Sequence, residues 1–148
     1  MKAMIFAAGL GTRLKPITDS LPKALVSVGG KPLIEHVSRK LKASGIDEAV
    51  VNVHHFADKV EAWTGEQDIM KMEVSDERKM LLETGGAVLH ARRYLEGCGH
   101  FLIHNVDIMS NADLKWFETQ VREDALATLL VSNRPTKRFL LFEPGTMR

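Results

Sequence analysis

The sequence is poor in cysteine, and Cys98 is the only one among 148 residues. A single thiol cannot form a disulfide framework within the chain, and it cannot supply the several thiolates of a cysteine-based metal site. Disulfide-rich folds belong to oxidising compartments, so this composition favours a reducing one. We therefore expect a cytoplasmic protein.

The chain also lacks a long apolar run and an excess of charge. Its apolar stretches fall well short of the ~20 residues that a membrane-spanning helix needs, and the N-terminus shows no signal-peptide pattern. The formal net charge of +1 argues against general adhesion to nucleic acid or membranes. With 45% hydrophobic and 26% charged residues, the composition is typical of a soluble globular domain with a substantial core.

The charged residues, however, are unevenly distributed along the chain. Residues 1–42 hold eight lysines and arginines against two acids, a local balance of +6 in a nearly neutral chain. A solvated helix face accounts for the cations at 39–42, whereas Arg13 and Lys23 lie among turn residues. The asymmetry predicts a focused anion-binding site in the first third of the chain.

Short apolar runs alternate with segments of helical periodicity. Strands are predicted at residues 2–8, 49–53, 72–75, 100–104, 125–132 and 138–143. Helices are predicted at residues 32–44, 56–65 and 84–95, and after a cap at Ser110 or Asn111, with Leu114, Phe117 and Val121 facing inward. This alternation predicts a Rossmann-like three-layer α/β/α fold with a mostly parallel, mixed sheet. Because no closing helix follows the last strand, we expect a domain that is truncated at its C-terminus.

Ligands of open α/β sheets bind beyond the carboxyl ends of the strands, and the loop after residues 2–8 has the features of such a site. Gly9 and Gly11 allow backbone N–H groups to converge on an anion, and Arg13 can clamp a phosphate with its planar fork. Two common phosphate motifs do not fit. A dinucleotide fingerprint requires glycine where Leu14 stands, which disfavours an NAD-dependent oxidoreductase, and the Gly-Lys-Ser/Thr ending of a P-loop is absent.

A longer pattern does fit, namely G-x-G-T-R-L-x-P-x-T followed by P-K. Its members are Gly9, Gly11, Thr12, Arg13, Leu14, Pro16, Thr18, Pro22 and Lys23. This pattern resembles the signature of the sugar-phosphate nucleotidyltransferases, and PKALVSVGGKPLIEH at 22–36 is also similar to that family. The resemblance implies a nucleotide-diphospho-sugar transferase fold. Residues 1–148 would form a single nucleotidyltransferase domain, its N-terminal nucleotide-binding part, without the C-terminal sugar-binding part.

The resemblance also implies an activity and its residues. An NTP and a sugar 1-phosphate would condense to an NDP-sugar and pyrophosphate, with Mg²⁺ as the cofactor. The implied nucleotide-binding residues are Ala8, Gly9, Gly11, Thr12, Arg13, Lys23, Thr84, Gly85 and Gly86. The implied catalytic residues are Arg13, Lys23 and Asp107. The implied sugar-phosphate-binding residues are Lys23 and Asn105.

Asp107 follows the strand at 100–104, where a carboxylate suits Mg²⁺ because this ion takes one or two carboxylates together with phosphate oxygens. The family's metal-binding aspartate is usually preceded by glycine, and Val106 stands here instead. A turn-capping role for Asp107 therefore stays open. His104 is expected to pack beside the site rather than to act in it.

The segment LLETGGA at 81–87 corresponds to the loop that reads the base in the family. Two readings stay open for its glycines, close approach to a base and relief of crowding at a helix start. Residues 83–86 look most like the branch that joins UTP to N-acetylmuramate 1-phosphate, and are also similar to mannose and heptose 1-phosphate guanylyltransferases. A non-catalytic nucleotide-binding or regulatory module is the alternative, and a homo-oligomer is left open.

Overall fold

The computed structural model describes residues 1–132, 135, 143 and 145. Packing divides the chain into residues 1–115 and residues 116–148, and each part is described by itself. The predicted strand at 138–143 lies outside the described residues except for its last position. The assignment of the whole chain to a single domain stays a prediction.

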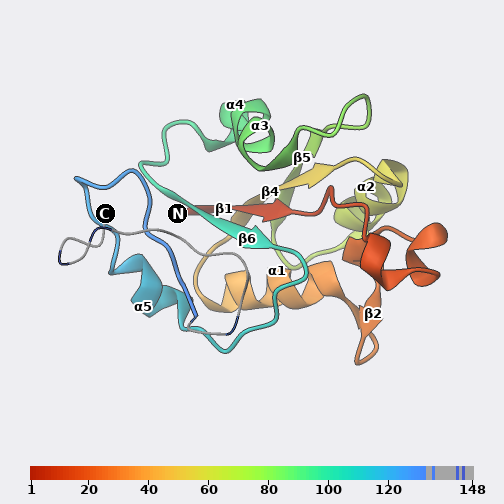
Figure 1. Ribbon diagram of the computed structural model, residues 1–148, viewed down its shortest axis with the longest axis horizontal. Helices are drawn as coiled ribbons and strands as arrows, with labels where there is room; N and C mark the ends of the chain where they lie inside the picture. Colours follow the sequence, from red (N-terminus) through yellow and green to blue (C-terminus); the bar gives the residue numbers. More distant parts are fainter. Residues whose placement is uncertain (133–134, 136–142, 144, 146–148) are drawn as a thin grey trace. The chain divides into compact units, whose positions relative to one another are not determined.

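Four parallel strands form the central sheet, in the order β5-β4-β1-β6. The strands are β1 (Lys2–Phe6), β4 (Glu48–Val53), β5 (Lys71–Asp76) and β6 (Phe101–Asn105). Met4 of β1 lies opposite Val50 of β4 and Ile103 of β6, which sets the register. All three strand pairs of this sheet are parallel, as the alternation of strands and helices predicts, and the arrows of β1, β4 and β6 point the same way in Figure 1.

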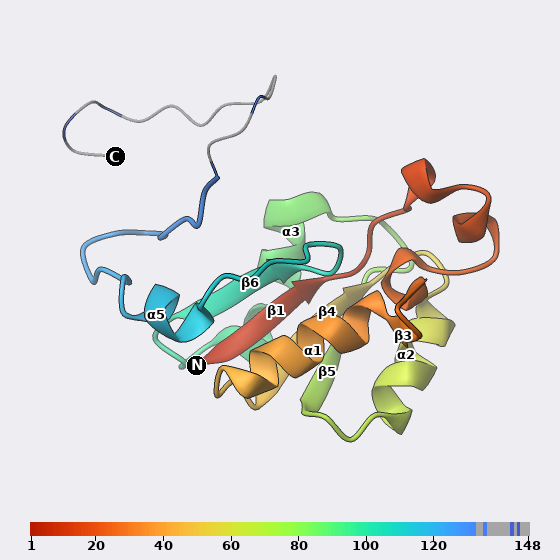
Figure 2. The same ribbon diagram turned by 90° about the horizontal axis from the view of Figure 1, so that it is seen from below.

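Helices cover both faces of this sheet. They are α1 (Leu33–Ala43), α2 (Ala57–Glu66), α3 (Glu83–His90) and α4 (Arg92–Leu95). Figures 1 and 2 show α3 and α4 on one face, with α1 and α2 on the other. A small antiparallel pair, β2 (Ser27–Val28) with β3 (Lys31–Pro32), leads into α1. The predicted three-layer α/β/α fold is therefore confirmed.

Among the described residues, no helix is long and apolar enough to cross a membrane.

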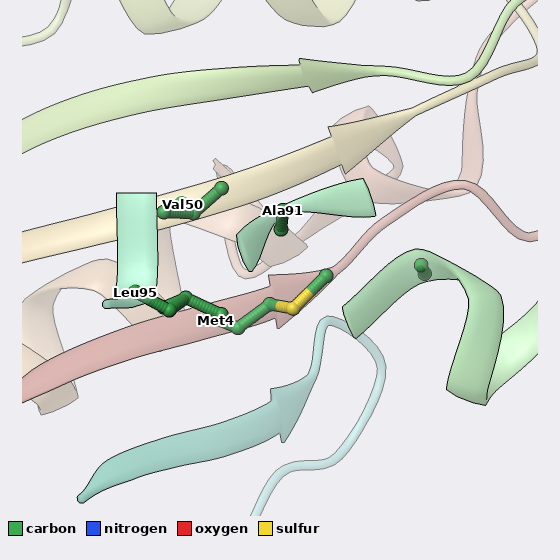
Figure 3. Close-up of a cluster of buried hydrophobic side chains, with 5 residues drawn as sticks. Met4, Val50, Ala91 and Leu95 are labelled. Atoms are coloured by element: carbon green, nitrogen blue, oxygen red, sulfur yellow. The ribbon is translucent and has the colours of Figure 1, made fainter. Parts of the chain in front are cut away.

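The core lies on both faces of the sheet because buried parallel strands are apolar on both sides. Under α3 and α4, buried side chains form one cluster, shown in Figure 3: Met4, Val50, Ala87, Ala91 and Leu95. Ile5 and Val51 alternate with them and are fully buried as well. Burial of each large side chain stabilises the fold by about 1.5–3 kcal/mol before conformational entropy is counted.

Three predicted elements differ from the structure. The helix at 84–95 is divided at Ala91, which caps α3 and precedes α4. A fifth helix, α5 (Leu114–Glu118), begins later than the predicted cap and ends before Val121, which is exposed. The strand predicted at 125–132 is wrong, because this described run is irregular and mostly exposed. Apolar, β-branched sequence becomes a strand only beside a partner, and no described strand pairs with it.

The strand order defines a switch in the direction of winding. From β1 the chain passes through α1 to β4 and through α2 to β5, moving steadily to one side. It then crosses the other face through α3 and α4 and places β6 on the opposite side of β1. The topological switch point therefore lies between β1 and β6, where doubly wound sheets bind their ligands.

Candidate functional site

Two segments far apart in the sequence meet at this switch point. The Val106 N–H donates to the Phe6 carbonyl at 3.1 Å, so the turn after β6 stays next to the end of β1. The Lys23 ammonium forms an ion pair with the Asp107 carboxylate across 84 residues of chain. Their side chains keep 17% and 34% of their exposure. The structure thus brings together two of the predicted catalytic residues, one from each loop.

The turn after β1 requires glycine at position 11. Gly11 has φ +64°, and a Cβ there would lie 2.8 Å from Cγ2 of Thr18 and 3.1 Å from Cβ of Lys23. The Thr18 hydroxyl, almost completely buried, donates to the Gly11 carbonyl at 2.9 Å and holds the turn closed. At Gly9, by contrast, no described atom lies within 4 Å of an added Cβ. The packing of the chain therefore requires glycine at position 11, whereas at position 9 it leaves room for a Cβ.

Short 3₁₀ turns carry the two predicted cations. The turns are Thr12–Leu14, Ile17–Asp19 and Lys23–Leu25. Lys23 opens the last of them, and the buried Ala24 beside it anchors that turn to the interior. Arg13 lies in the first turn and is exposed, and its guanidinium makes no hydrogen bond or ion pair with any described residue. Arg13 is therefore available for an anion, as the motif predicts.

The predicted base-reading loop is shorter than expected, because α3 already begins at Glu83. Thr84, Gly85 and Gly86 belong to its first turn; the first two are exposed and the third is partly exposed. A Cβ at Gly86 would lie 3.1 Å from Cβ of Leu82, so crowding at the helix start accounts for this glycine. Gly85 has open space around it, as Gly9 does.

The sequence interpretation missed a buried polar network that joins these two segments. Asn52 Oδ1 accepts the Ala7 N–H at 2.8 Å and the Ala8 N–H at 3.4 Å. Asn52 Nδ2 donates to Glu77 Oε1 at 2.9 Å, and Glu77 Oε2 accepts the Leu82 N–H at 3.3 Å. The available signal was an asparagine inside the β-branched run 49–53, where a polar side chain needs a partner.

The end of β6 combines buried and exposed side chains. Val106 is 2% exposed, so its side chain packs inward, whereas Asp107 lies at the surface. Val106 is also not among the described residues of positive φ. Asn105 is exposed, and its carbonyl accepts the His104 Nδ1–H at 2.7 Å. Burial lowers the pKa of His104 below its ordinary value, against the opposing effect of that hydrogen bond, while the charge of Lys40 lowers it further. His104 thus lies beside the site, as expected, and its environment favours the neutral ring.

The fit of a divalent cation depends on Asp107. No group of three or more His, Cys, Asp or Glu side chains that could hold a metal exists among the described residues. Asp107 instead offers one partly exposed carboxylate at the switch point. Mg²⁺ is commonly held by one or two carboxylates, water and phosphate oxygens, so the residues fit an ion that is largely ligated by a nucleotide.

A doubly wound sheet with a glycine loop at its switch point defines the class of nucleotide-binding α/β domains, and this chain has both features. Within that class the chain belongs to the Nucleotidyl transferase family, which matches residues 2–140. The predicted family is thereby confirmed.

Curated relatives agree with this assignment. The chain is 48% identical over 109 residues to N-acetylmuramate alpha-1-phosphate uridylyltransferase of Caulobacter vibrioides, covering 71% of this chain and 45% of the relative. It is 36% identical over 126 residues to probable mannose-1-phosphate guanylyltransferase 2 of Arabidopsis thaliana, covering 78% and 34%. The chain therefore spans less than half the length of these two proteins.

Solved structures agree as well. HddC from Yersinia pseudotuberculosis complexed with GMP-PN is 29% identical, with a TM-score of 0.70 over 80% of this chain and 52% of HddC. A putative glucose-1-phosphate thymidylyltransferase from Bacillus anthracis also gives 0.70 at 25% identity, over 81% and 49%. The nucleotide-diphospho-sugar transferase type of fold is thus confirmed.

Proposed function

We propose that this chain is the nucleotide-binding part of a sugar-1-phosphate nucleotidyltransferase, which converts an NTP and a sugar 1-phosphate into an NDP-sugar and pyrophosphate. The observation that carries the proposal is the ion pair between Lys23 and Asp107. It joins the motif loop after β1 to the carboxylate after β6 at the switch point of the sheet. Such a pairing of a cation with a metal-binding type of carboxylate suits the handling of phosphates.

The proposed reaction is one in-line displacement at phosphorus. A phosphate oxygen of the sugar 1-phosphate forms a bond to the α-phosphorus of the NTP, and the bond from that phosphorus to the β-phosphate oxygen breaks. The attacking phosphate is already an anion at neutral pH, so no general base is required. The barrier is repulsion between anions and the charge that develops on the leaving pyrophosphate, which cations and preset N–H dipoles lower.

The residues after β1 have distinct proposed roles. Backbone N–H groups of Gly9 and Gly11 hold the triphosphate, and the exposed guanidinium of Arg13 neutralises its β- and γ-phosphates. Lys23 neutralises the sugar phosphate and the α-phosphate. Because Lys23 now pairs with Asp107, the bound phosphates compete with that carboxylate for the ammonium.

The other residues complete the site. Asp107 is the proposed Mg²⁺ ligand, and the ion would neutralise phosphate charge when bound. Ala8 and Thr12 flank the phosphates, and Asn105 contacts the sugar phosphate. The base lies at Thr84–Gly86, where Gly85 leaves open space.

The relatives support an order among the proposed substrates. UTP with N-acetylmuramate 1-phosphate comes first, since the Caulobacter vibrioides uridylyltransferase is 48% identical. GTP with mannose 1-phosphate comes next, since the Arabidopsis thaliana relative is a probable mannose-1-phosphate guanylyltransferase.

The test is pyrophosphate release from each NTP with Mg²⁺ and a panel of sugar 1-phosphates. Release that depends on one NTP and one sugar phosphate supports the proposal and identifies the substrates. Nucleotide binding without release by any pair would fit a nucleotide-binding part that turns over only together with a sugar-binding part, and equally the non-catalytic nucleotide-binding or regulatory module. Absence of nucleotide binding would overturn both.

A further inference from the structure

Glu77 is a buried carboxylate for which the proposed reaction gives no use. It directly follows β5 and is only 2% exposed. Acidic side chains are almost never buried at this level unless they are paired. No lysine or arginine among the described residues forms an ion pair with it, and its oxygens instead accept from Asn52 and from the Leu82 N–H. Burial of this carboxylate costs free energy, so we expect its position to have a structural role.

Asn52 uses both ends of its amide in this network. It lies in β4, opposite Phe6 of β1 and Ser75 of β5, and is 3% exposed. Its carbonyl oxygen accepts the N–H of Ala7, the first residue after β1, and its amino group donates to Glu77. A backbone N–H needs an acceptor and a carboxylate needs a donor, so this orientation satisfies both. Neither aspartate nor leucine could replace both functions.

The carboxylate itself starts from a firmly held stretch of backbone. The Glu77 N–H donates to the Val53 carbonyl at 2.8 Å, which extends the pairing of β4 with β5 by one residue. The Glu77 carbonyl accepts the His54 Nδ1–H at 2.7 Å and the Met80 N–H at 3.0 Å. From this rigid position the side chain reaches the Leu82 N–H, one residue before α3.

We propose that Asn52 and Glu77 are positioning residues that set the spacing between the end of β1 and the start of α3. This inference rests on the proposed function, in which residues 8–13 hold the phosphates and residues 84–86 hold the base of one nucleotide. A rigid link between the two segments fixes the distance from phosphate to base that the site accepts. The link acts through backbone groups and touches no reacting atom.

Two single variants and their combination test the link. The combination exchanges the amide at position 52 with the carboxylate at position 77 and leaves the net charge unaltered. Glu77→Gln cannot accept from both Asn52 and the Leu82 N–H, so one donor is left unpaired. Asn52→Asp places a second carboxyl group against that of Glu77. In the double variant, the carboxylate introduced at position 52 would accept from Ala7 and from the amide introduced at position 77, whose carbonyl oxygen would accept from Leu82. All groups are then satisfied again with the hydrogen bond reversed.

The main readout is the Kd for UTP and for pyrophosphate, measured by calorimetry. Each single variant is expected to weaken UTP binding by about tenfold, the effect of leaving one buried polar group unpaired. Glu77→Gln should leave pyrophosphate binding within about twofold, because Asn52 still holds the β1 end. The double variant should return the UTP Kd to within about threefold of the unaltered chain.

Val60→Ala is the matched structural control, because Val60 is a buried residue of α2 that lies outside the network. It should lower Tm and leave both Kd values unchanged. Unaltered UTP binding in Glu77→Gln, or a folded double variant that does not recover, overturns the proposal. If Asn52→Asp does not fold, Glu77→Gln and the double variant still decide the matter.

Failure of the proposed function gives a different result, namely that the unaltered chain binds no nucleotide. The link is then judged by amide hydrogen exchange. Relative to Val60→Ala, Glu77→Gln should accelerate exchange at Leu82 and leave Ala7 unchanged, because Asn52 still accepts the Ala7 N–H. Asn52→Asp should accelerate exchange at both residues, and the double variant should restore it. Equal exchange in all variants overturns the link.

Discussion

The two sides of the proposed nucleotide site are built in opposite ways. On the phosphate side, Arg13 and Lys23 lie on 3₁₀ turns, and a steric requirement at Gly11 fixes the loop. On the base side, Thr84–Gly86 carry no charge, and the buried carboxylate of Glu77 holds the segment that precedes them. The first side combines local turn chemistry with one distant ion pair, between Lys23 and Asp107, and the second depends on contacts between distant strands.

This difference teaches where charge is useful in such a site. Exposed cations suit the phosphate side because they must bind and release a highly charged ligand. A buried network suits the base side because the bases carry no net charge and are distinguished by their shape and by their hydrogen-bonding groups, which must be met at a fixed position. Replacements on the phosphate side should therefore change turnover or triphosphate binding, whereas replacements on the base side should change nucleotide affinity and leave pyrophosphate binding nearly unchanged.

The largest expected effect is that of Lys23→Ala on turnover. Loss of the ammonium should lower kcat by about 10²–10³, the scale found when one charge-stabilising donor is removed from an active site. Pyrophosphate release under saturating substrates measures it. Lys15→Ala is the matched control, since Lys15 belongs to the same loop and pairs only with Asp19 among the described residues. Near-full turnover in Lys23→Ala would contradict the role of Lys23.

The two glycines after β1 should behave differently on replacement by alanine. Gly11→Ala should lower the free energy of unfolding by about 1–3 kcal/mol, because φ +64° is unfavourable and the new Cβ would meet Thr18. Gly9→Ala should change stability by less than about 0.5 kcal/mol and still weaken triphosphate binding. Urea denaturation and calorimetry measure the two effects. Equal loss of stability in both variants would show that packing, not a ligand, explains Gly9.

Asp107→Asn sharpens the comparison further, because it frees Lys23 while removing the proposed metal ligand. Without Mg²⁺, the variant should bind a triphosphate about 2–5-fold more tightly, the range expected for release from a partly exposed ion pair. With Mg²⁺, it should bind less tightly than the unaltered chain. Calorimetric titrations with and without the ion measure whether the variant binds the triphosphate more tightly or less tightly than the unaltered chain. Identical responses of both proteins to Mg²⁺ would remove Asp107 from the metal site.

The smallest expected effect concerns His104 and pH. Its pKa in the folded protein is lowered by burial, so the unfolded chain binds the proton more readily as pH falls through 6.5. The stability contributed by the neutral ring is therefore complete above about pH 6.5 and declines below it. His104→Gln should flatten that decline, as measured by urea denaturation from about pH 7.5 to about pH 5, on either side of the ordinary histidine pKa. An unchanged slope would place the effect elsewhere.

Much of the fold could be predicted because the elements have strong local signals. The apolar run at 2–8 and the β-branched run at 49–53 correspond to β1 and β4, and the periodicity at 32–44 corresponds to α1. The run at 125–132 carries a similar signal, and it fails because strand formation depends on a partner that composition does not reveal.

The candidate site also has a part with a local sequence signal and a part that depends on contacts between distant residues. The phosphate side could be proposed from the sequence because its glycines and cations lie within fifteen residues, from Gly9 to Lys23. The meeting of Lys23 with Asp107 follows from the rule for carboxyl ends of parallel strands. Asn52 and Glu77 could not be paired from sequence, because their contact depends on the register of β4 and on the path of the chain after β5.

The central claim is that the loop after β1 holds the triphosphate, and a crystal structure of the chain with bound UTP tests it most directly. The claim predicts phosphate oxygens within hydrogen-bonding distance of the N–H groups of residues 9–13, with Arg13 and Lys23 turned toward them. Phosphates bound at any other part of the chain, with this loop empty, would contradict it.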